Sequence, residues 1–278
     1  MARSMLYICV LVSLMLGITG CLSAESGKGY SDESSPGEIY PEEDPALGDR
    51  KIDFAGYSWH VKEALYPAGP GPNYFSASRR NVYVDDEGAL HLHIIHRRER
   101  PYCSEVVTEE AFGYGSYLFY LEGAVDAIDP QEVLGLFTWD TAPAENNREI
   151  DIEFSRWGVS ERRENGQYVV QPFSEERMYA FEFELSGDNS THLLRWLPGR
   201  VDFASCHGHV EPSAIIGGQV PLIESWSYEG GTGSGPVPTA GDARVRINLY
   251  LYEGKPTPDR EDQEIVIRDF LFIPEGEE

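Results

Sequence analysis

The sequence is poor in basic residues and in cysteine. Its 278 residues include 22 Lys and Arg against 47 Asp and Glu, which gives a net charge of −25. Because binding to nucleic acid or to anionic lipid headgroups needs a basic face, this deficit argues against both kinds of partner. The four cysteines form no CxxC pair, so no zinc-ribbon pattern is present. Hydrophobic residues still make up 41% of the chain, enough for a folded core.

Several catalytic and metal-binding signatures are also missing. No Gly-x-Ser-x-Gly sequence occurs, so a lipase-type nucleophile turn is excluded. The Gly- and Pro-rich segment from Gly230 to Gly241 lacks the lysine of a phosphate-binding loop and is expected to be a plain loop. Two histidine pairs, His91 with His93 and His207 with His209, have no further ligands at metal-site spacing. We therefore expect no metal and no cofactor, although a structural Ca²⁺ stays open.

The one long apolar run lies at the N-terminus, from Met5 to Thr19 after the single charge of Arg3. It is shorter than the ~20 residues of a transmembrane helix and is typical of a secretory signal. It ends in Ile18-Thr19-Gly20-Cys21, which resembles a bacterial lipobox. That resemblance implies cleavage before Cys21 and lipidation of its thiol; the alternative is an ordinary signal peptide. We expect an exported monomer, anchored by lipid to the outer face of a membrane at the cell surface or in the periplasm.

The composition divides the chain into three segments. Residues 1–20 are the signal, and residues 21–50 are an acidic Ser/Gly/Pro-rich tether without apolar periodicity. Residues 51–278 are long enough for one all-β domain. Within that domain, Cys103 and Cys206 form a candidate disulfide in an oxidising compartment, with two free thiols as the alternative.

Short segments rich in aromatic and β-branched residues follow one another through this domain, and no long amphipathic helical window occurs. In Leu90 to Ile94 and in Arg244 to Tyr252, every second residue is apolar, which is the period of half-buried strands. Further strands are expected at 81–84, 115–121, 133–139, 149–154, 179–185, 192–196 and 264–273. The pattern predicts an antiparallel β-sandwich, or jelly roll, in one domain.

The segment from Glu149 to Phe154 reads Glu-Ile-Asp-Ile-Glu-Phe. On a strand, Glu149, Asp151 and Glu153 point to one face and the apolar residues point to the other. Repulsion among three carboxylates raises their pKa values, so the cluster tends to keep a proton near neutral pH. Glycoside hydrolysis uses such an arrangement, with one ionised and one protonated carboxyl group. The alternative is a solvated strand face.

The order of motifs in the domain resembles glycoside hydrolase family 16, the lichenases and laminarinases. The uninterrupted Glu-x-Asp-x-Glu form is closer to lichenases than to laminarinases. The resemblance rests on these segments: Asn81-Val82, Cys103-Ser104-Glu105, Phe112 to Tyr117, Leu136 to Trp139, Glu149 to Phe154, Thr191 to Gly199 and Ile247 to Tyr250. The sequence departs from the family at Val107, where lichenases carry an arginine, and at Tyr250, where a tryptophan is usual.

The resemblance implies that Glu149 is the nucleophile, Glu153 the general acid/base and Asp151 their electrostatic partner. It also implies a concanavalin A-like jelly roll with a concave substrate cleft. In that cleft, sugar subsites would be lined by Asn81, Glu105, Phe137, Trp139, Asn248 and Tyr250. For Trp139 and Tyr250 the alternative is core packing. The expected function is retaining, endo-acting hydrolysis of a β-linked polysaccharide. Two other functions stay open: transglycosylation on the same fold, and a carbohydrate-binding surface lipoprotein without activity.

Overall fold

The computed structural model describes residues 48–98, 100–231 and 235–277. The signal, the lipidation site Cys21 and nearly all of the tether lie outside these residues, so their assignments stay predictions. Within the described ranges, no helix is both long and apolar enough to span a membrane.

The described strands form two large antiparallel sheets. The first sheet contains, in spatial order, β1 (Lys51–Phe54), β2 (Tyr57–Val61), β8 (Ser104–Ala111), β17 (Arg244–Leu251), β10 (Glu132–Trp139), β11 (Ile150–Phe154), β12 (Gly166–Val170) and β13 (Met178–Phe181). The second sheet contains β16 (Leu222–Tyr228), β15 (Arg200–His207), β14 (Asn189–Leu197), β9 (Gly115–Glu122), β18 (Gln263–Pro274), β6 (Leu90–Arg97) and β5 (Val82–Val84), with β7 (Arg100–Tyr102) paired to β6.

The remaining elements are short. A two-stranded ribbon is formed by β3 (Ala64–Ala68) and β4 (Asn73–Phe75). One short helix, α1 (Pro212–Ile216), and three 3₁₀ segments, η1 (Val125–Ala127), η2 (Pro143–Arg148) and η3 (Tyr252–Gly254), lie in the connections. In the described part of the segment from Gly230 to Gly241, no strand or helix forms, as expected.

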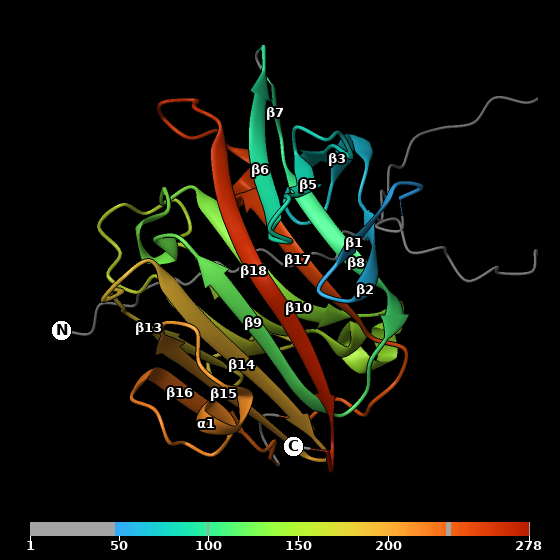
Figure 1. Ribbon diagram of the computed structural model, residues 1–278, viewed down its shortest axis with the longest axis vertical. Helices are drawn as coiled ribbons and strands as arrows, with labels where there is room; N and C mark the ends of the chain where they lie inside the picture. Colours follow the sequence, from blue (N-terminus) through green and yellow to red (C-terminus); the bar gives the residue numbers. More distant parts are fainter. Residues whose placement is uncertain (1–47, 99, 232–234, 278) are drawn as a thin grey trace, which may run out of the picture.

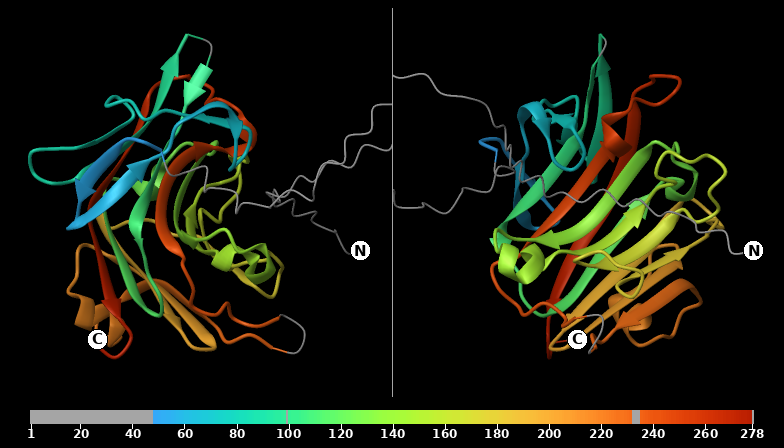
Figure 2. Two further views of the ribbon diagram at one scale, coloured as in Figure 1. Left: turned by 90° about the vertical axis from the view of Figure 1, so that its right-hand side faces the viewer. Right: turned by 180° about the vertical axis from the view of Figure 1, so that it is seen from behind.

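The two sheets pack face to face, with β9, β14 and β18 in front and β17 and β10 behind them in Figure 1; Figure 2 shows the same layers from the side and from behind. Alternation along each strand explains the packing. On β10, Leu134 and Leu136 are fully buried in the core between the sheets, and on β6 so are Leu90 and Leu92. The intervening residues face away from the core. The predicted all-β sandwich is therefore confirmed.

Cys103 and Cys206 are both buried and both free, so the candidate disulfide is wrong. Cys103 lies in the core between the sheets, where its thiol donates to Asn73 Oδ1 at 3.4 Å. Cys206 belongs to a second apolar cluster, with Leu118 and Ile215 of α1. Because Leu118 alternates on β9 with residues of the main core, this cluster lies on the opposite face of the second sheet. The two thiols therefore have the thickness of a sheet between them.

Candidate active site

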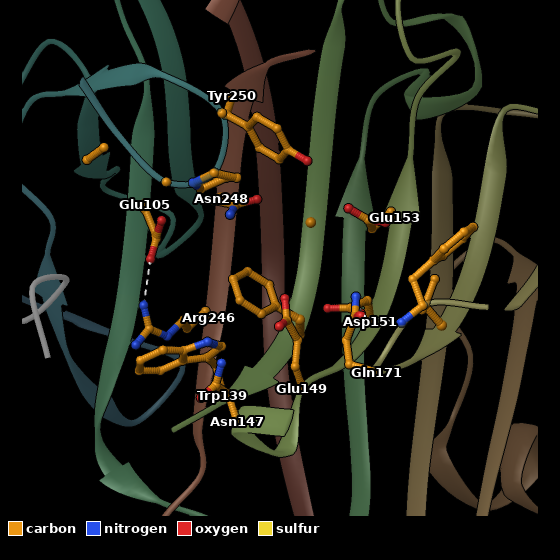
Figure 3. A pocket seen from close by; sticks show the side chains of 18 of the residues that line it. Glu105, Trp139, Asn147, Glu149, Asp151, Glu153, Gln171, Arg246, Asn248 and Tyr250 are labelled. Atoms are coloured by element: carbon orange, nitrogen blue, oxygen red, sulfur yellow. Dashed lines mark hydrogen bonds and ion pairs between the residues drawn. The ribbon is translucent and has the colours of Figure 1, made fainter. Parts of the chain in front are cut away.

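Strand β11 separates its side chains as the alternation predicts. Ile150, Ile152 and Phe154 are fully buried in the core, whereas Asp151 and Glu153 face a pocket on the outer side of the first sheet. Glu149 directly precedes the strand and lines the same pocket. Figure 3 shows the three carboxylates one after another along β11. The structure thus brings the predicted trio together on one face.

Strand pairing builds the pocket floor as rows that cross the sheet. In one row, Glu105 pairs with Asn248, Asn248 with Gly135, Gly135 with Glu153 and Glu153 with Gln167. These residues come from five different strands. The floor is therefore a property of the register of the sheet and not of one local motif.

The next row adds one cation and one carboxyl group to the floor, Arg246 and Asp151. Val107 pairs with Arg246, Arg246 with Phe137, Phe137 with Asp151 and Asp151 with Val169. The pocket above both rows has a volume of about 510 Å³, which is within the usual range for ligand sites.

Amide groups hold two of the carboxylates in place. Gln167 Nε2 donates to Glu153 Oε2 at 2.5 Å, and Gln171 Nε2 donates to Asp151 Oδ2 at 3.3 Å. Both glutamines belong to the pocket lining, on β12 and directly after it. Neither was predicted from the sequence, although the alternation on β12 places Gln167, Val169 and Gln171 on one face.

The environment favours the protonated forms of the trio. Burial, followed by the charge of Glu153, raises the pKa of Glu149 to about 7, and the positive charge of Arg246 opposes that rise. Burial and then the charges of Glu149 and Glu153 raise the pKa of Asp151 well above its ordinary value. Burial also raises the pKa of Glu153, against hydrogen bonds from Gln167 and Tyr250. The trio therefore retains a proton near neutral pH.

A buried ion-pair network forms the end of the floor near β2. Lys62 Nζ lies 2.7 Å from Glu105 Oε2, and Arg246 Nη1 lies 3.0 Å from Glu105 Oε1. The exposed fractions of the three side chains are 6% or less, so each charge depends on the others for compensation. Glu105 lines the pocket as predicted, but both of its oxygens are engaged by cations.

Arg246 connects this network to an aromatic wall. Its guanidinium lies 4.1 Å from the centre of the Trp139 ring, so the two groups stack (Figure 3). Arg246 also stands directly opposite Val107 in the pairing of β8 with β17. An arginine therefore reaches this part of the floor from the neighbouring strand. The position of Arg246 on the floor could have been predicted from the sequence, because the two-residue period from Arg246 to Tyr250 places both on one face.

Aromatic rings and one amide complete the lining. Phe137, Trp139 and Tyr250 all line the pocket, and Trp139 and Tyr250 are only partly buried, which favours the cleft over core packing. Asn248 Oδ1 is buried and accepts no hydrogen bond from the described residues. It lies over Gly135, where an added Cβ would come within 2.6 Å of it. The Asn248 side chain thus fills the space above Gly135, and it leaves one buried acceptor of the floor without a partner among the described residues.

Asn81 does not line the pocket, so the prediction that it contacts sugar is wrong. It is fully buried in the turn before β5. Its Nδ2 donates to Tyr102 O at 2.8 Å, and its Oδ1 accepts from Arg97 Nη2 at 2.8 Å. Its amide is used to join this turn to the β6–β7 hairpin.

The backbone that leads into Glu149 is strained. Asn146, Asn147 and Arg148 have φ values of 51°, 56° and 49°, in the left-handed region that costs non-glycine residues free energy. Arg148 is held there by Asp140 Oδ2 at 2.6 Å and by Thr239 O at 2.7 Å. These contacts fix the entry of the chain into β11.

In the part of the chain that the structure describes, no group of three or more His, Cys, Asp or Glu side chains is arranged to hold a metal ion. His91 and His93 instead share the carboxylate of Glu264, at 2.6 and 3.2 Å. The pocket lining itself offers carboxyl groups, amides, cations and aromatic rings.

Comparison with known proteins identifies the fold. No protein-family model matches the sequence, and no curated protein matches it. Among solved structures, a Bacillus licheniformis β-glucanase is 14% identical, with a TM-score of 0.54 over 78% of this chain and 92% of that chain. A glycoside hydrolase family 16 endo-glucanase from Bacteroides ovatus, solved in complex with G4G3G-2F-DNP, is 10% identical, with a TM-score of 0.52 over 77% and 94%. A protein described as an immunostimulatory antigen and pseudo β-1,3-glucanase of Mycobacterium tuberculosis is 16% identical, with a TM-score of 0.53 over 77% and 89%. The chain has the fold of these proteins.

Proposed function

We propose that this chain, which has the fold of the family 16 glucanases, is a retaining endo-glycosidase that cleaves a β-linked polysaccharide. The observation that carries the proposal is the trio on β11, which faces a pocket, keeps a proton near neutral pH and is held by amides. A binding protein of the same fold has no use for three neighbouring carboxylates that repel each other, one of them buried and two partly buried. The trio therefore favours an enzyme over a lectin.

The first half of the reaction forms a glycosyl-enzyme. Glu153, protonated, gives its proton to the glycosidic oxygen while Glu149, ionised, attacks the anomeric carbon. The bond from that carbon to the leaving oxygen breaks, and an ester to Glu149 forms. Four residues of strand place the two Cα atoms about 13 Å apart at ~3.3 Å per residue, so side chains that lean inward can reach the ~5–5.5 Å carboxyl separation of retaining enzymes.

The second half releases the sugar. Glu153, now ionised, takes a proton from water, and the oxygen attacks the anomeric carbon so that the bond to Glu149 breaks. If a sugar hydroxyl enters in place of water, the same steps give transglycosylation. Asp151 lies between the two glutamates and holds a proton at the step where Glu153 has lost its own.

The surrounding residues supply orientation and charge. Gln167 keeps Glu153 in position through its 2.5 Å hydrogen bond. The positive charge of Arg246 favours the ionised form of Glu149. Asn248 lines the floor of the pocket, and the partly exposed ring of Trp139 offers an apolar surface for a sugar ring. The proposal also includes export and a lipid anchor on Cys21.

The test uses the full chain with a panel of β-1,3-1,4-glucan, β-1,3-glucan, xyloglucan, agarose, carrageenan and galactan, and measures new reducing ends. We expect cleavage of at least one polymer. The first product should have the same anomeric configuration as the bond that is cleaved. Glu149→Ala should be silent on that polymer, and the exposed control Glu161→Ala should match the unaltered chain. Activity that survives Glu149→Ala contradicts the mechanism, and binding without turnover favours a carbohydrate-binding protein.

A further inference from the structure

Arginines gather at one end of this acidic chain. Arg79 and Arg80 lie in the turn between β4 and β5, and Arg97, Arg98 and Arg100 lie where β6 meets β7, at the upper end of Figure 1. The total of basic residues is only 22, so this grouping is a marked local excess. The net charge predicts no basic face, whereas the fold gathers one.

Hydrogen bonds join the two segments and the start of the domain into one surface. Arg97 Nη2 donates to Ser78 Oγ at 2.6 Å, which connects the hairpin to the turn. Arg50 Nη1 donates to Ala77 O at 2.8 Å. Burial lowers the pKa of Arg50, and the like charge of Arg79 lowers it further, so these two cations lie near each other.

Most of these arginines lack an acidic partner. Of the six, only Arg80 has a carboxylate of the described residues within ion-pair distance, at 3.6 Å from Asp262. Arg97 is instead bound by hydroxyl and amide oxygens. Elsewhere, exposed cations such as Arg163 and Arg200 pair with glutamates at 2.7 and 2.5 Å. In a chain with an excess of 25 negative charges, positive groups left without carboxylates indicate an external anion.

Two tyrosines order the guanidinium groups. Arg100 lies 4.2 Å from the centre of the Tyr74 ring and Arg97 lies 5.0 Å from that of Tyr102. The two rings are themselves 6.0 Å apart. Stacking of this kind limits the rotamers of both arginines. It leaves the N–H groups of Arg100 available for oxyanions, whereas Arg97 Nη2 already donates to Ser78 Oγ and Asn81 Oδ1. The surface is therefore preorganised for bidentate contacts with sulfate or carboxylate groups.

We propose that this basic surface, formed by Arg50, Arg79, Arg80, Arg97, Arg98 and Arg100, binds an anionic polysaccharide that carries sulfate or carboxylate groups. A polymer chain is narrow enough to follow the surface. A planar anionic bilayer would also approach the acidic remainder of the molecule within the Debye length of ~8 Å and would be repelled.

The position of the surface also favours a polysaccharide. Tyr74 lies on β4, and the ribbon of β3 and β4 contributes Tyr66 and Pro70 to the pocket lining. A sugar chain that leaves the pocket across this ribbon arrives at the basic surface. This step rests on the proposed function, whereas the charge argument does not.

The test measures binding of the full chain in the Glu149→Gln background, where the proposed reaction cannot consume the polymer. The probes are a sulfated galactan, a polygalacturonate and a neutral β-1,3-1,4-glucan, each immobilised at 0.05 and 0.15 M salt. The variant is R79E/R98E/R100E. Its matched control is R163E/R200E/R268E, which makes the same change of charge at arginines that pair with glutamates away from the surface.

We expect at least one anionic polymer to bind more tightly than the neutral glucan and to weaken with salt. R79E/R98E/R100E should lose about tenfold or more in affinity, and the control should stay within about twofold. Equal losses in both variants, or no binding of either anionic polymer, overturn the proposal. Phosphatidylglycerol vesicles and DNA are tested as further probes. Arginine-dependent binding to either of them, when neither anionic polysaccharide binds, also overturns the proposal. Hydrolysis of a neutral glucan is measured separately, with the chain that keeps Glu149. The proposed glycosidase activity and the proposed anion-binding surface can therefore fail independently.

Discussion

Replacing Glu149 by glutamine should stabilise the folded protein at alkaline pH and not at acidic pH. Glutamine has the size of glutamate but cannot ionise, so it removes the free-energy cost of a charged group in this partly buried place. The pKa of Glu149 is raised from 4.5 to about 7 in the folded chain. That difference corresponds to about 3 kcal/mol at ~1.4 kcal/mol per unit of pKa.

The sign follows from proton linkage. Below pH 4.5 the group is protonated in both the folded and the unfolded state, so it contributes no difference. Between pH 4.5 and about 7 the unfolded chain loses the proton while the folded chain keeps it, so the free energy of unfolding falls as the pH rises. Above about pH 7 the whole cost is present. Loss of the Glu149 charge also eases the ionisation of Asp151, which adds to the gain.

Urea unfolding at pH 4 and at pH 8 measures the effect directly. We expect Glu149→Gln to raise the free energy of unfolding by about 3 kcal/mol at pH 8, or roughly 6–12 °C in Tm, with little change at pH 4. The exposed Glu161→Gln should shift stability by less than ~0.5 kcal/mol at either pH. A gain of equal size at both pH values would refute the reasoning, and so would a loss at pH 8.

Three further predictions concern the pocket and its support. Arg246→Met should move the acid limb of the pH profile of kcat/KM to higher pH by roughly 1 pH unit, because the cation that favours the ionised nucleophile is lost. Arg246→Lys keeps that cation and should leave the acid limb near its original position. Gly135→Ala should lower kcat/KM for a polymer by about tenfold or more, because its methyl group would lie 2.6 Å from Asn248 Oδ1 and would displace that side chain from the floor; unchanged kinetics would show that the position of Asn248 does not matter for the reaction. Arg177→Met should cost about 3 kcal/mol in urea unfolding, because the buried guanidinium bonds Tyr228 and three backbone carbonyls; a cost below ~1 kcal/mol would contradict that role.

Alternation made the fold and the central trio predictable from the sequence. A two-residue period assigns each side chain of β11 and β17 to a face, so the order of residues alone was enough to place Glu149, Asp151 and Glu153 together. The same rule would have placed Arg246 beside Asn248. These predictions concern neighbours within one strand, where geometry is local.

Contacts between strands could not be predicted in the same way. Arg246 and Glu105 are 141 residues apart in the chain, and only the register of β8 against β17 brings them together. The burial of Asn81 depends on the β6–β7 hairpin, and the separation of Cys103 from Cys206 depends on which face of a sheet each one takes. Periodicity gives the face of a residue but not its partner across the sheet.

The alternation on β11 also bears on how the chain selects its native pairing. If β11 slipped by one residue against β10, Glu149, Asp151 and Glu153 would turn into the core and their isoleucine neighbours would turn to water. Burying even one unpaired carboxylate costs several kcal/mol, which is comparable to the whole stability of a domain. The residues proposed to break a glycosidic bond therefore also disfavour the wrong alignment of this strand during folding.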